Sequence, residues 1–358
     1  MINGICPYFT MFPLEFPLGI LTSRAKPCHR VLDPFCGRGT TNFAARLLGL
    51  ESLGIDSSPV AVAITAAKLV STTTDEIMAE AQAILDDNTK AATPKGTFWR
   101  WAYHRDVLHA LCRFRAAMLA DCSTPARVAL RGIILGALHG PKQKTFPSYF
   151  SNQCPRTYAP KPAYSVRFWQ SRDLKPDRVD ILGIIKRRAD RYFSKLPISV
   201  GFVNWADSRR SESFQPYESN QKFDWVITSP PYYGMRTYIP DQWLRNWFVG
   251  GPEIVDYSNK NQIIHTSPDN FATDLRQVWL NAAAACSSEA RLVIRFGGLS
   301  DRRADPKEIV QKSLQDSNWR VLTIKYAGTA SEGRRQADSF LRTKSTPLVE
   351  YDIWACRR

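Results

Sequence analysis

The sequence contains no hydrophobic run long enough to cross a lipid bilayer, which takes about 20 apolar residues in a helix. Three prolines, at positions 7, 13 and 17, interrupt the apolar residues 1–21, and no basic residue precedes them as in a secretory leader. These absences predict a soluble, cytoplasmic protein that does not contact a membrane.

Paired cysteines are absent too. The eight cysteines are scattered, and none forms a C-x-x-C pair or stands near a histidine at metal-ligand spacing. We therefore expect reduced, mostly buried thiols and no metal. Repeats and low-complexity segments are also missing, so 358 residues with 44% hydrophobic content predict one large globular domain, or one domain with an insertion.

The positive charge is concentrated in one part of the chain, whose net charge is +15. Between residues 90 and 212, 23 Lys and Arg stand against 8 Asp and Glu, whereas the remainder has 25 of each kind. An ordinary solvated surface spreads its charge more evenly. The concentration therefore favours a surface that binds a polyanion.

Short apolar segments alternate with helical patterns near both ends of the chain. Strands are predicted at residues 30–32, 52–55, 198–203, 225–228, 291–296, 320–326 and 348–355. Helices are predicted at residues 41–48, 59–70, 271–286 and 306–316. This alternation predicts an α/β fold with a doubly wound, mostly parallel, Rossmann-like sheet, whose last two strands form an antiparallel hairpin at its edge.

Strand patterns are missing between residues 71 and 197. Helices are predicted there at 75–87, 104–119, 125–138 and 179–193. We therefore expect a catalytic domain of residues 1–70 and 198–358, interrupted by a basic, mainly helical insertion at 71–197. The segment 141–176 is rich in Pro, Arg and aromatic residues, and we expect about half of its aromatic side chains in the core of the insertion.

The first predicted strand runs into Asp33-Pro34-Phe35-Cys36-Gly37-Arg38-Gly39-Thr40. Two glycines let the backbone pass close to a ligand with φ values that other residues resist. The next helix, capped near Thr40 or Thr41, would direct N–H groups at a carboxylate, which suits the methionine end of S-adenosylmethionine. Asp56, at the end of the following strand, can accept both ribose hydroxyls.

A nicotinamide cofactor is the alternative for this loop. Its G-x-G-x-x-G pattern requires a third glycine where this chain has Asn42. Asp33, ahead of the glycines, would lie beside the amino group of a bound S-adenosylmethionine. The loop therefore favours S-adenosylmethionine over a dinucleotide.

A second motif, Ser229-Pro230-Pro231-Tyr232, follows the predicted strand 225–228, at a carboxyl end where α/β sheets bind substrates. The prolines fix φ and expose the carbonyl of Pro230, so that this carbonyl and Ser229 Oγ can accept both hydrogens of an amine. Tyr232 would stack on the face of a base. A structural interpretation, in which the prolines only end a strand, is weaker beside the glycine loop.

The motif indicates direct in-line methyl transfer, driven by the positioning of two bound reactants. Methylation at carbon 5 of cytosine instead needs a thiol nucleophile, usually in a Pro-Cys pair. This chain offers only Cys154-Pro155, in the reverse order. We therefore disfavour a covalent intermediate.

Together the two motifs resemble those of the amino-group DNA methyltransferases, which methylate cytosine N4 or adenine N6. The resemblance implies a methyltransferase fold, S-adenosylmethionine as cofactor and DNA as substrate. The cofactor residues that it implies are Asp33, Phe35, Cys36, Gly37, Gly39, Thr40, Asp56 and Asp207. The catalytic residues that it implies are Ser229, Pro230, Pro231 and Tyr232. The segment 8–13 resembles the one that closes over the cofactor in this family.

The chain departs from the family in the place of its large insertion, which precedes Asp207. If the insertion recognises the target, its position is unusual, and residues 233–267, with Trp243, Arg245, Trp247 and Phe248, could share the task. Ser-Pro-Pro-Tyr is commoner among enzymes that resemble cytosine-N4 methylators, and Asp-Pro-Pro-Tyr among adenine ones. We therefore favour cytosine over adenine.

A base in a duplex must be flipped out to reach a cofactor held in a cleft, at a cost of a few kcal/mol. Phosphate contacts from the insertion could supply that energy. The residues expected to contact DNA are Arg156, Arg167, Arg172, Arg187, Arg188 and Arg191. Partner subunits of a restriction or defence system are also compatible with this function, and the sequence leaves the oligomeric state open.

Two other functions stay open. An RNA base-amine methyltransferase would use a related catalytic loop, but only about thirty residues precede the cofactor loop, too few for an appended RNA-binding domain. A non-catalytic nucleic-acid-binding subunit could keep the fold, but such a copy is free to lose residues such as Asp33, Gly39 and Ser229, which are intact here.

Overall fold

The computed structural model describes residues 2–8, 12–87, 90–141, 147–153, 161–214, 222–234, 238–256, 263, 266–298, 304–329 and 349–358. The chain folds into two compact units. One, the sheet unit, consists of residues 10–65, 197–236 and 259–358. The other, the helical unit, consists of residues 1–9, 66–196 and 237–258.

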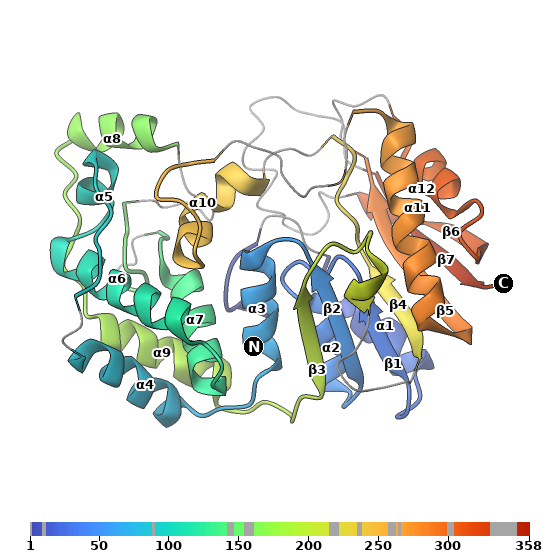
Figure 1. The fold of residues 1–358 in the computed structure, drawn as a ribbon, viewed down its shortest axis with the longest axis horizontal. Helices are drawn as coiled ribbons and strands as arrows, with labels where there is room; N and C mark the ends of the chain where they lie inside the picture. The colour runs from blue at the N-terminus through green and yellow to red at the C-terminus, as the bar shows by residue number, and fades with distance from the viewer. Residues whose placement is uncertain are drawn as a thin grey trace. The chain divides into compact units, whose positions relative to one another are not determined.

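The sheet unit contains a seven-stranded sheet in the order β3-β2-β1-β4-β5-β7-β6 (Figure 1). Its strands are β1 Arg30–Asp33, β2 Glu51–Asp56, β3 Gly201–Trp205, β4 Phe223–Thr228, β5 Cys286–Gly297, β6 Trp319–Thr329 and β7 Val349–Arg357. The first five pair in parallel, and β7 pairs antiparallel with both β5 and β6. The predicted mostly parallel sheet with a closing antiparallel hairpin is confirmed.

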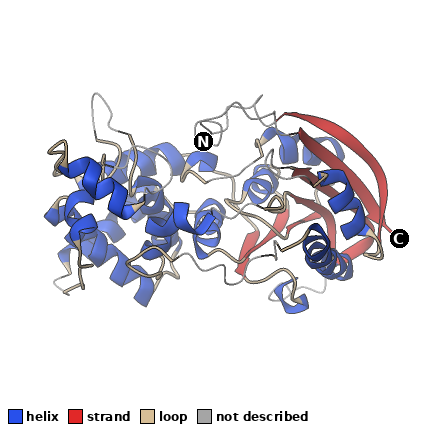
Figure 2. Ribbon diagram, turned by 90° about the horizontal axis from the view of Figure 1, so that it is seen from above, coloured by secondary structure: helices blue, strands red, loops and turns tan. Residues whose placement is uncertain are grey.

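Helices bury both faces of this sheet (Figure 2). On one face α1 (Glu15–Arg24) and α2 (Thr40–Leu47) pack with Val31, and on the other α11 (Pro268–Ala285) and α12 (Pro306–Leu314) pack with Leu32. Neighbouring residues of a strand point to opposite faces, so β1, buried at all four positions, belongs to both cores. This explains why the central strands are continuous apolar runs.

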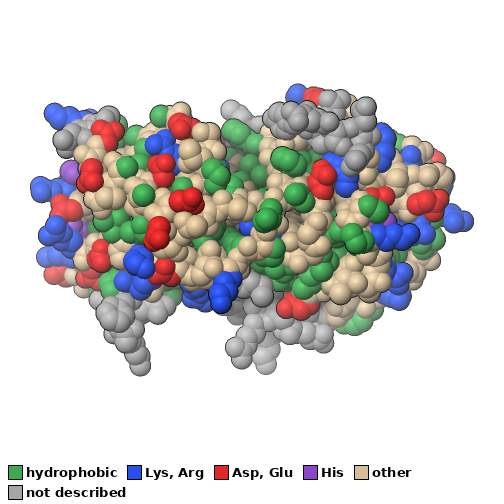
Figure 3. Space-filling view, turned by 90° about the horizontal axis from the view of Figure 1, so that it is seen from below, with side chains coloured by type: hydrophobic (Ala, Val, Ile, Leu, Met, Phe, Trp, Pro, Cys, Tyr) green, Lys and Arg blue, Asp and Glu red, His purple; other side chains and the backbone are tan. Residues whose placement is uncertain are grey.

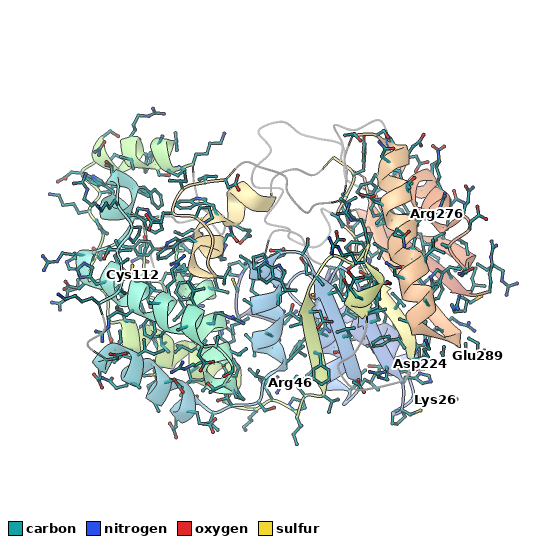
Figure 4. The ribbon with its side chains drawn as sticks, viewed as in Figure 1. Lys26, Arg46, Cys112, Asp224, Arg276 and Glu289 are labelled. Atoms are coloured by element: carbon teal, nitrogen blue, oxygen red, sulfur yellow. The ribbon has the colours of Figure 1, made fainter. Side chains whose placement is uncertain are left out.

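Polar contacts tie the strands together at the end of the sheet away from the glycine loop. Asp224 of β4, labelled in Figure 4, accepts hydrogen bonds from the Arg30 N–H at 3.0 Å and from Ser287 Oγ at 3.1 Å. On α2, the buried Arg46 donates from Nε to the Pro197 carbonyl at 2.8 Å, just before β3. The Asp224 bonds thus join β4 to its neighbours β1 and β5, and the Arg46 bond joins α2 to the segment before β3.

The helical unit is built around aromatic side chains. Its helices are α4 Thr74–Asp86, α5 Thr97–Ala102, α6 Arg105–Ala120, α7 Pro125–Ala137, α8 Pro162–Gln170, α9 Ile181–Phe193 and α10 Tyr238–Phe248. The rings of Trp99 and Trp247 lie 4.5 Å apart between centroids, and Phe98 contacts Trp243 at 4.9 Å. The boundary between the two units falls within α3 (Pro59–Leu69).

The helical unit differs from the expected insertion 71–197, because it also contains α10 and the amino-terminal residues 1–9. The sequence pattern missed α10, whose tryptophans are interleaved with polar residues, and also α1, α5 and α8, which are short or begin beside a proline. No helix in the described ranges is long and apolar enough to span a bilayer. In the same ranges no disulfide joins the cysteines, most of which are buried, and no metal-ligand cluster is found.

Candidate active site

The glycine loop joins β1 to α2 in a tight turn. Gly37 and Gly39 have φ values of +52° and +70°, in the left-handed region that favours glycine. The Gly39 N–H donates to the Cys36 carbonyl at 2.7 Å, and the Thr65 hydroxyl donates to the Gly37 carbonyl at 3.0 Å. A Cβ at Gly39 would lie 2.6 Å from Thr65 Cγ2 and Oγ1. The loop is thus closed against α3 with no room for a side chain.

Asp33 lies buried at the carboxyl end of β1, 1% exposed. Its Oδ1 accepts hydrogen bonds from the Thr228 hydroxyl at 2.6 Å and the Phe35 N–H at 3.1 Å, whereas Oδ2 has no hydrogen-bond partner among the described residues. Burial raises the pKa of Asp33 to about 6, against hydrogen bonds that lower it. A buried acceptor without a donor indicates a polar or cationic ligand group.

Asp56, expected to bind ribose, ends β2 beside the same loop. Its two oxygens accept hydrogen bonds from the N–H groups of Gly37 at 2.8 Å and Ser58 at 2.9 Å. Burial raises its pKa to about 6. Each carboxylate oxygen has a second lone pair, so Asp56 can hold the glycine loop and still accept a ribose hydroxyl.

The expected capping of α2 by Thr40 or Thr41 is wrong. Both threonines lie inside the helix, and the N-cap is Gly39, which makes no side-chain capping bond. The Thr41 hydroxyl donates instead to the Ile227 carbonyl of β4 at 3.1 Å. The N-cap residue therefore leaves the first N–H groups of α2 open to a ligand carboxylate.

The Ser229–Tyr232 loop follows β4, which lies beside β1 in the sheet. Ser229 and Pro231 are half-buried, whereas Pro230 and Tyr232 are buried. The Tyr232 ring contacts the Phe296 ring edge-on at 5.5 Å between centroids, and its hydroxyl donates to the buried Glu350 carboxylate. No sequence motif pointed to Glu350, or to Thr228, which joins this loop to Asp33.

Asp207, expected at the cofactor adenine, lies just beyond β3. It accepts hydrogen bonds from the Arg209 guanidinium, the shortest 2.7 Å, and Arg209 also pairs with Asp274 at 3.0 Å. Burial opposes ionisation of Asp207, but hydrogen bonds and charge from Arg209 outweigh it and lower the pKa. The neighbouring Ser208 hydroxyl donates to the Pro34 carbonyl at 2.6 Å, which brings this segment to the glycine loop.

The cofactor residues named from the sequence therefore meet in the sheet unit, apart from segment 8–13, of which residues 9–11 lie outside the described ranges. Phe35 packs edge-on against Trp279 at 6.0 Å, and Cys36 is buried beside Thr65. A crowded glycine turn, an unpartnered buried carboxylate oxygen and an uncapped helix start together fit S-adenosylmethionine.

The arginines expected at DNA have different surroundings in the helical unit. Arg187 donates to the Pro147 carbonyl at 2.8 Å and Arg188 to the Ser148 carbonyl at 2.9 Å. Both side chains therefore hold the segment that contains these two residues. Arg191 is exposed and lies over the Tyr192 ring at 5.6 Å. Arg167 and Arg172 are exposed on and after α8. Arg156 lies outside the described residues.

The residues of the 233–267 segment proposed to share target recognition are instead core residues. Trp243, Arg245, Trp247 and Phe248 are at most 3% exposed. Arg245 donates from Nε to the Leu135 carbonyl at 3.1 Å. Because α10 packs these side chains into the helical unit, they are not available to read a base.

Comparison with known proteins gives a family for the amino-terminal segment. Residues 3–67 match the model of the N6/N4 methyltransferase family, described as DNA methylase. None of the curated proteins matches the chain.

Solved methyltransferase structures resemble the chain only distantly. An rRNA methyltransferase from Streptomyces viridochromogenes is 12% identical, with a TM-score of 0.33 over 97% of this chain and 87% of that one. A magnesium protoporphyrin IX methyltransferase from Synechocystis, with bound S-adenosylmethionine, is 10% identical, with a TM-score of 0.35 over 96% and 78%.

The matched residues 3–67 contain β1, the glycine loop, β2 and Asp56, the part of the site that fits the cofactor. The amino-terminal part of the chain is accordingly similar to the DNA methylases over the residues that form the cofactor site.

Proposed function

We propose that the protein transfers a methyl group from S-adenosylmethionine to the exocyclic amine of a base in DNA, with cytosine N4 favoured over adenine N6. The observation that carries this proposal is the 2.6 Å hydrogen bond from Thr228 to Asp33. It joins the residue before Ser229 to the carboxylate of the cofactor loop. Cofactor and amine would therefore meet above two adjacent parallel strands, β1 and β4.

The chain's own groups supply positioning. The Pro230 carbonyl and Ser229 Oγ accept the two amine hydrogens, which directs the nitrogen lone pair toward the methyl donor. Asp33 Oδ2 would hold the cofactor ammonium, and the first turn of α2 would hold its carboxylate. S-adenosylmethionine supplies an activated methyl group. One carbon–nitrogen bond would form as the methyl carbon–sulfur bond breaks, the cofactor would leave as the neutral thioether, and the proton lost by the nitrogen would pass to solvent.

Nucleoside analysis tests the proposal. Purified protein incubated with duplex DNA and S-adenosylmethionine labelled in its methyl group should yield labelled N4-methylcytosine on mass spectrometry. N6-methyladenine would reassign the base and keep the reaction class. Label in RNA but not in DNA would contradict a DNA substrate.

We expect Ser229→Ala and Tyr232→Ala to lower the methylation rate by about 100-fold, because the amine loses its alignment. Both variants should bind S-adenosylmethionine as the unaltered protein does, since neither residue belongs to the cofactor loop. Ser23→Ala is the matched control, because the exposed Ser23 hydroxyl donates to the Gly19 and Ile20 carbonyls within α1. A full rate for Ser229→Ala would remove this loop from the reaction.

The nucleic-acid part of the proposal is supported by α8. Tyr164 and Phe168 are 62% and 38% exposed and stack at 6.3 Å between centroids, while the Arg172 guanidinium lies 4.0 Å from the Phe168 ring centre. Together with the exposed Arg167, this face pairs flat rings with cations, as surfaces that contact bases and phosphates do. Trp169, on the other side of α8, is buried.

The rest of the basic charge is more dispersed than the sequence suggested. Acidic residues of α4 fall in the helical unit, and on the face seen in Figure 3 Lys and Arg side chains are interspersed with Asp and Glu. Some arginines, such as Arg127 with Glu80 at 2.9 Å, are paired. The proposed DNA contact therefore depends on the α8 face more than on the total charge.

We expect the double variant Arg167→Ala and Arg172→Ala to bind DNA more weakly. The slope of log affinity against log salt concentration should become shallower by about 2, because two phosphate contacts are lost. Lys26→Ala with Arg320→Ala removes the same charge from exposed positions of the sheet unit and should change the slope little. Equal effects of the two double variants would argue against a specific contact at α8.

A further inference from the structure

The buried carboxylate of Glu350 contacts the Ser229–Tyr232 loop from a distant part of the sequence. Glu350 is the second residue of β7, is 3% exposed, and stands opposite Gly297 of β5 in the antiparallel register. It accepts a hydrogen bond from the Tyr232 hydroxyl, 118 residues away in the sequence. Because β5 separates β4 from β7 in the sheet, this bond crosses over an intervening strand.

Gly297 makes that crossing possible. A Cβ at position 297 would lie 2.9 Å from the Val349 carbonyl oxygen, 3.1 Å from Glu350 Cγ and 3.2 Å from Tyr232 Cζ. These distances are tighter than ordinary van der Waals contact, so a side chain at 297 would push the two bonded residues away. Because Gly297 has no side chain, Tyr232 and Glu350 can approach each other across β5.

The bond restrains the Tyr232 ring, whose orientation depends on only two side-chain torsions. Phe296 contacts the ring edge-on, and Phe271 stacks on Phe296 at 6.3 Å between centroids. A buried carboxyl group is costly unless it is hydrogen-bonded, so the bond to Glu350 favours the ring orientation that makes it. Packing and the hydrogen bond to Glu350 thus favour the same orientation of the ring.

We propose that Glu350 is a positioning residue for methyl transfer, acting through Tyr232. The inference rests on the proposed function, in which the Tyr232 ring stacks on the target base. By holding the phenol, Glu350 sets the plane of the base and keeps its amine at Ser229 and Pro230. In-line transfer depends steeply on such alignment, since a misplacement of about 1 Å can cost about 100-fold in rate.

The test compares three single variants of the full chain. Glu350→Ala removes the acceptor, Glu350→Gln keeps an acceptor oxygen at the same distance along the side chain, and Tyr232→Phe keeps the ring without the hydroxyl. We expect kcat to fall by about 100-fold in Glu350→Ala and in Tyr232→Phe, and by less than about tenfold in Glu350→Gln. The dissociation constant for S-adenosylmethionine should stay unchanged in all three, which also shows that the sheet unit is folded.

The double variant Glu350→Ala with Tyr232→Phe should be no slower than either single variant, because both changes break one bond. Glu289→Ala, an exposed position of β5 labelled in Figure 4, should leave kcat unchanged. Additive losses in the double variant, an unchanged kcat in Glu350→Ala, or no rescue by Gln would overturn the proposal.

The outcome is separable from that of the proposed function. If the unaltered protein labels RNA instead of DNA, the same variants are compared on RNA. The same kcat ratios between variant and unaltered protein then test the positioning role. If the unaltered protein labels DNA and Glu350→Ala matches it, the inference about Glu350 fails alone.

Discussion

Replacing Gly39 by alanine is expected to destabilise the sheet unit by roughly 2–5 kcal/mol and to abolish measurable cofactor binding. Two effects contribute to this loss of stability. An alanine with a left-handed backbone at φ +70° costs roughly 1–2 kcal/mol. A Cβ 2.6 Å from Thr65 also causes overpacking, which costs roughly 1–3 kcal/mol more. Thr65 cannot yield easily, because it is buried and β-branched. Thermal unfolding and calorimetric titration with S-adenosylmethionine measure both effects.

Gly49→Ala separates the two causes. Gly49 has nearly the same φ, +69°, but a Cβ there would meet nothing within 4 Å. We therefore expect a loss of only about 1–2 kcal/mol in the free energy of unfolding, with cofactor binding intact. Equal losses of unfolding free energy in Gly39→Ala and Gly49→Ala would show that the cost comes from backbone conformation alone. The glycine loop would then not be crowded.

Asp33→Asn is expected to weaken S-adenosylmethionine binding while making the folded chain more stable at pH 8. The pKa of Asp33, raised by burial to about 6, means that ionisation is unfavourable in the folded state. Between about pH 4 and pH 6 the folded chain holds a proton that the unfolded chain has lost, so the free energy of unfolding falls as pH rises. Asparagine has no charge to bury, and we expect a gain of roughly 1–3 kcal/mol above pH 7.

Cofactor binding should have the opposite pH dependence. The ligand ammonium favours the ionised form of Asp33, so affinity should be constant above about pH 7 and fall about tenfold per pH unit below about 6. In Asp33→Asn the affinity should depend on pH only weakly. The remaining dependence would come from Asp56, whose pKa is also about 6.

Asp207→Asn is the control for these titrations. Burial opposes the ionisation of Asp207, but Arg209 lowers its pKa, so it stays charged across this range. We expect its variant to keep the pH dependence of the unaltered protein. Binding that is independent of pH in the unaltered protein would place the ammonium away from Asp33.

The sequence predicted the strands and several of the helices because their signals are local. Apolar runs such as residues 225–228 are buried on both faces, and helices such as α9 have an amphipathic pattern with a clear cap at Asp180. The helix α10 escaped prediction, because its tryptophans pack against α5 and α6 residues more than a hundred positions earlier. Aromatic residues in a loop and aromatic residues in a core have the same local pattern.

The sequence by itself determined which functional groups the chain offers: a glycine turn after Asp33, an acid at the next strand end and a Ser-Pro-Pro-Tyr loop. Backbone conformation and hydrogen-bonding capacity belong to residue types and short spacings, so they can be read without a fold. Only the tertiary structure decided which of these groups touch. The Thr228–Asp33 bond needs β1 beside β4, and the Tyr232–Glu350 bond needs a bare Gly297 between β4 and β7. Strand order brings these residues together, and strand order is set by packing of the whole sheet.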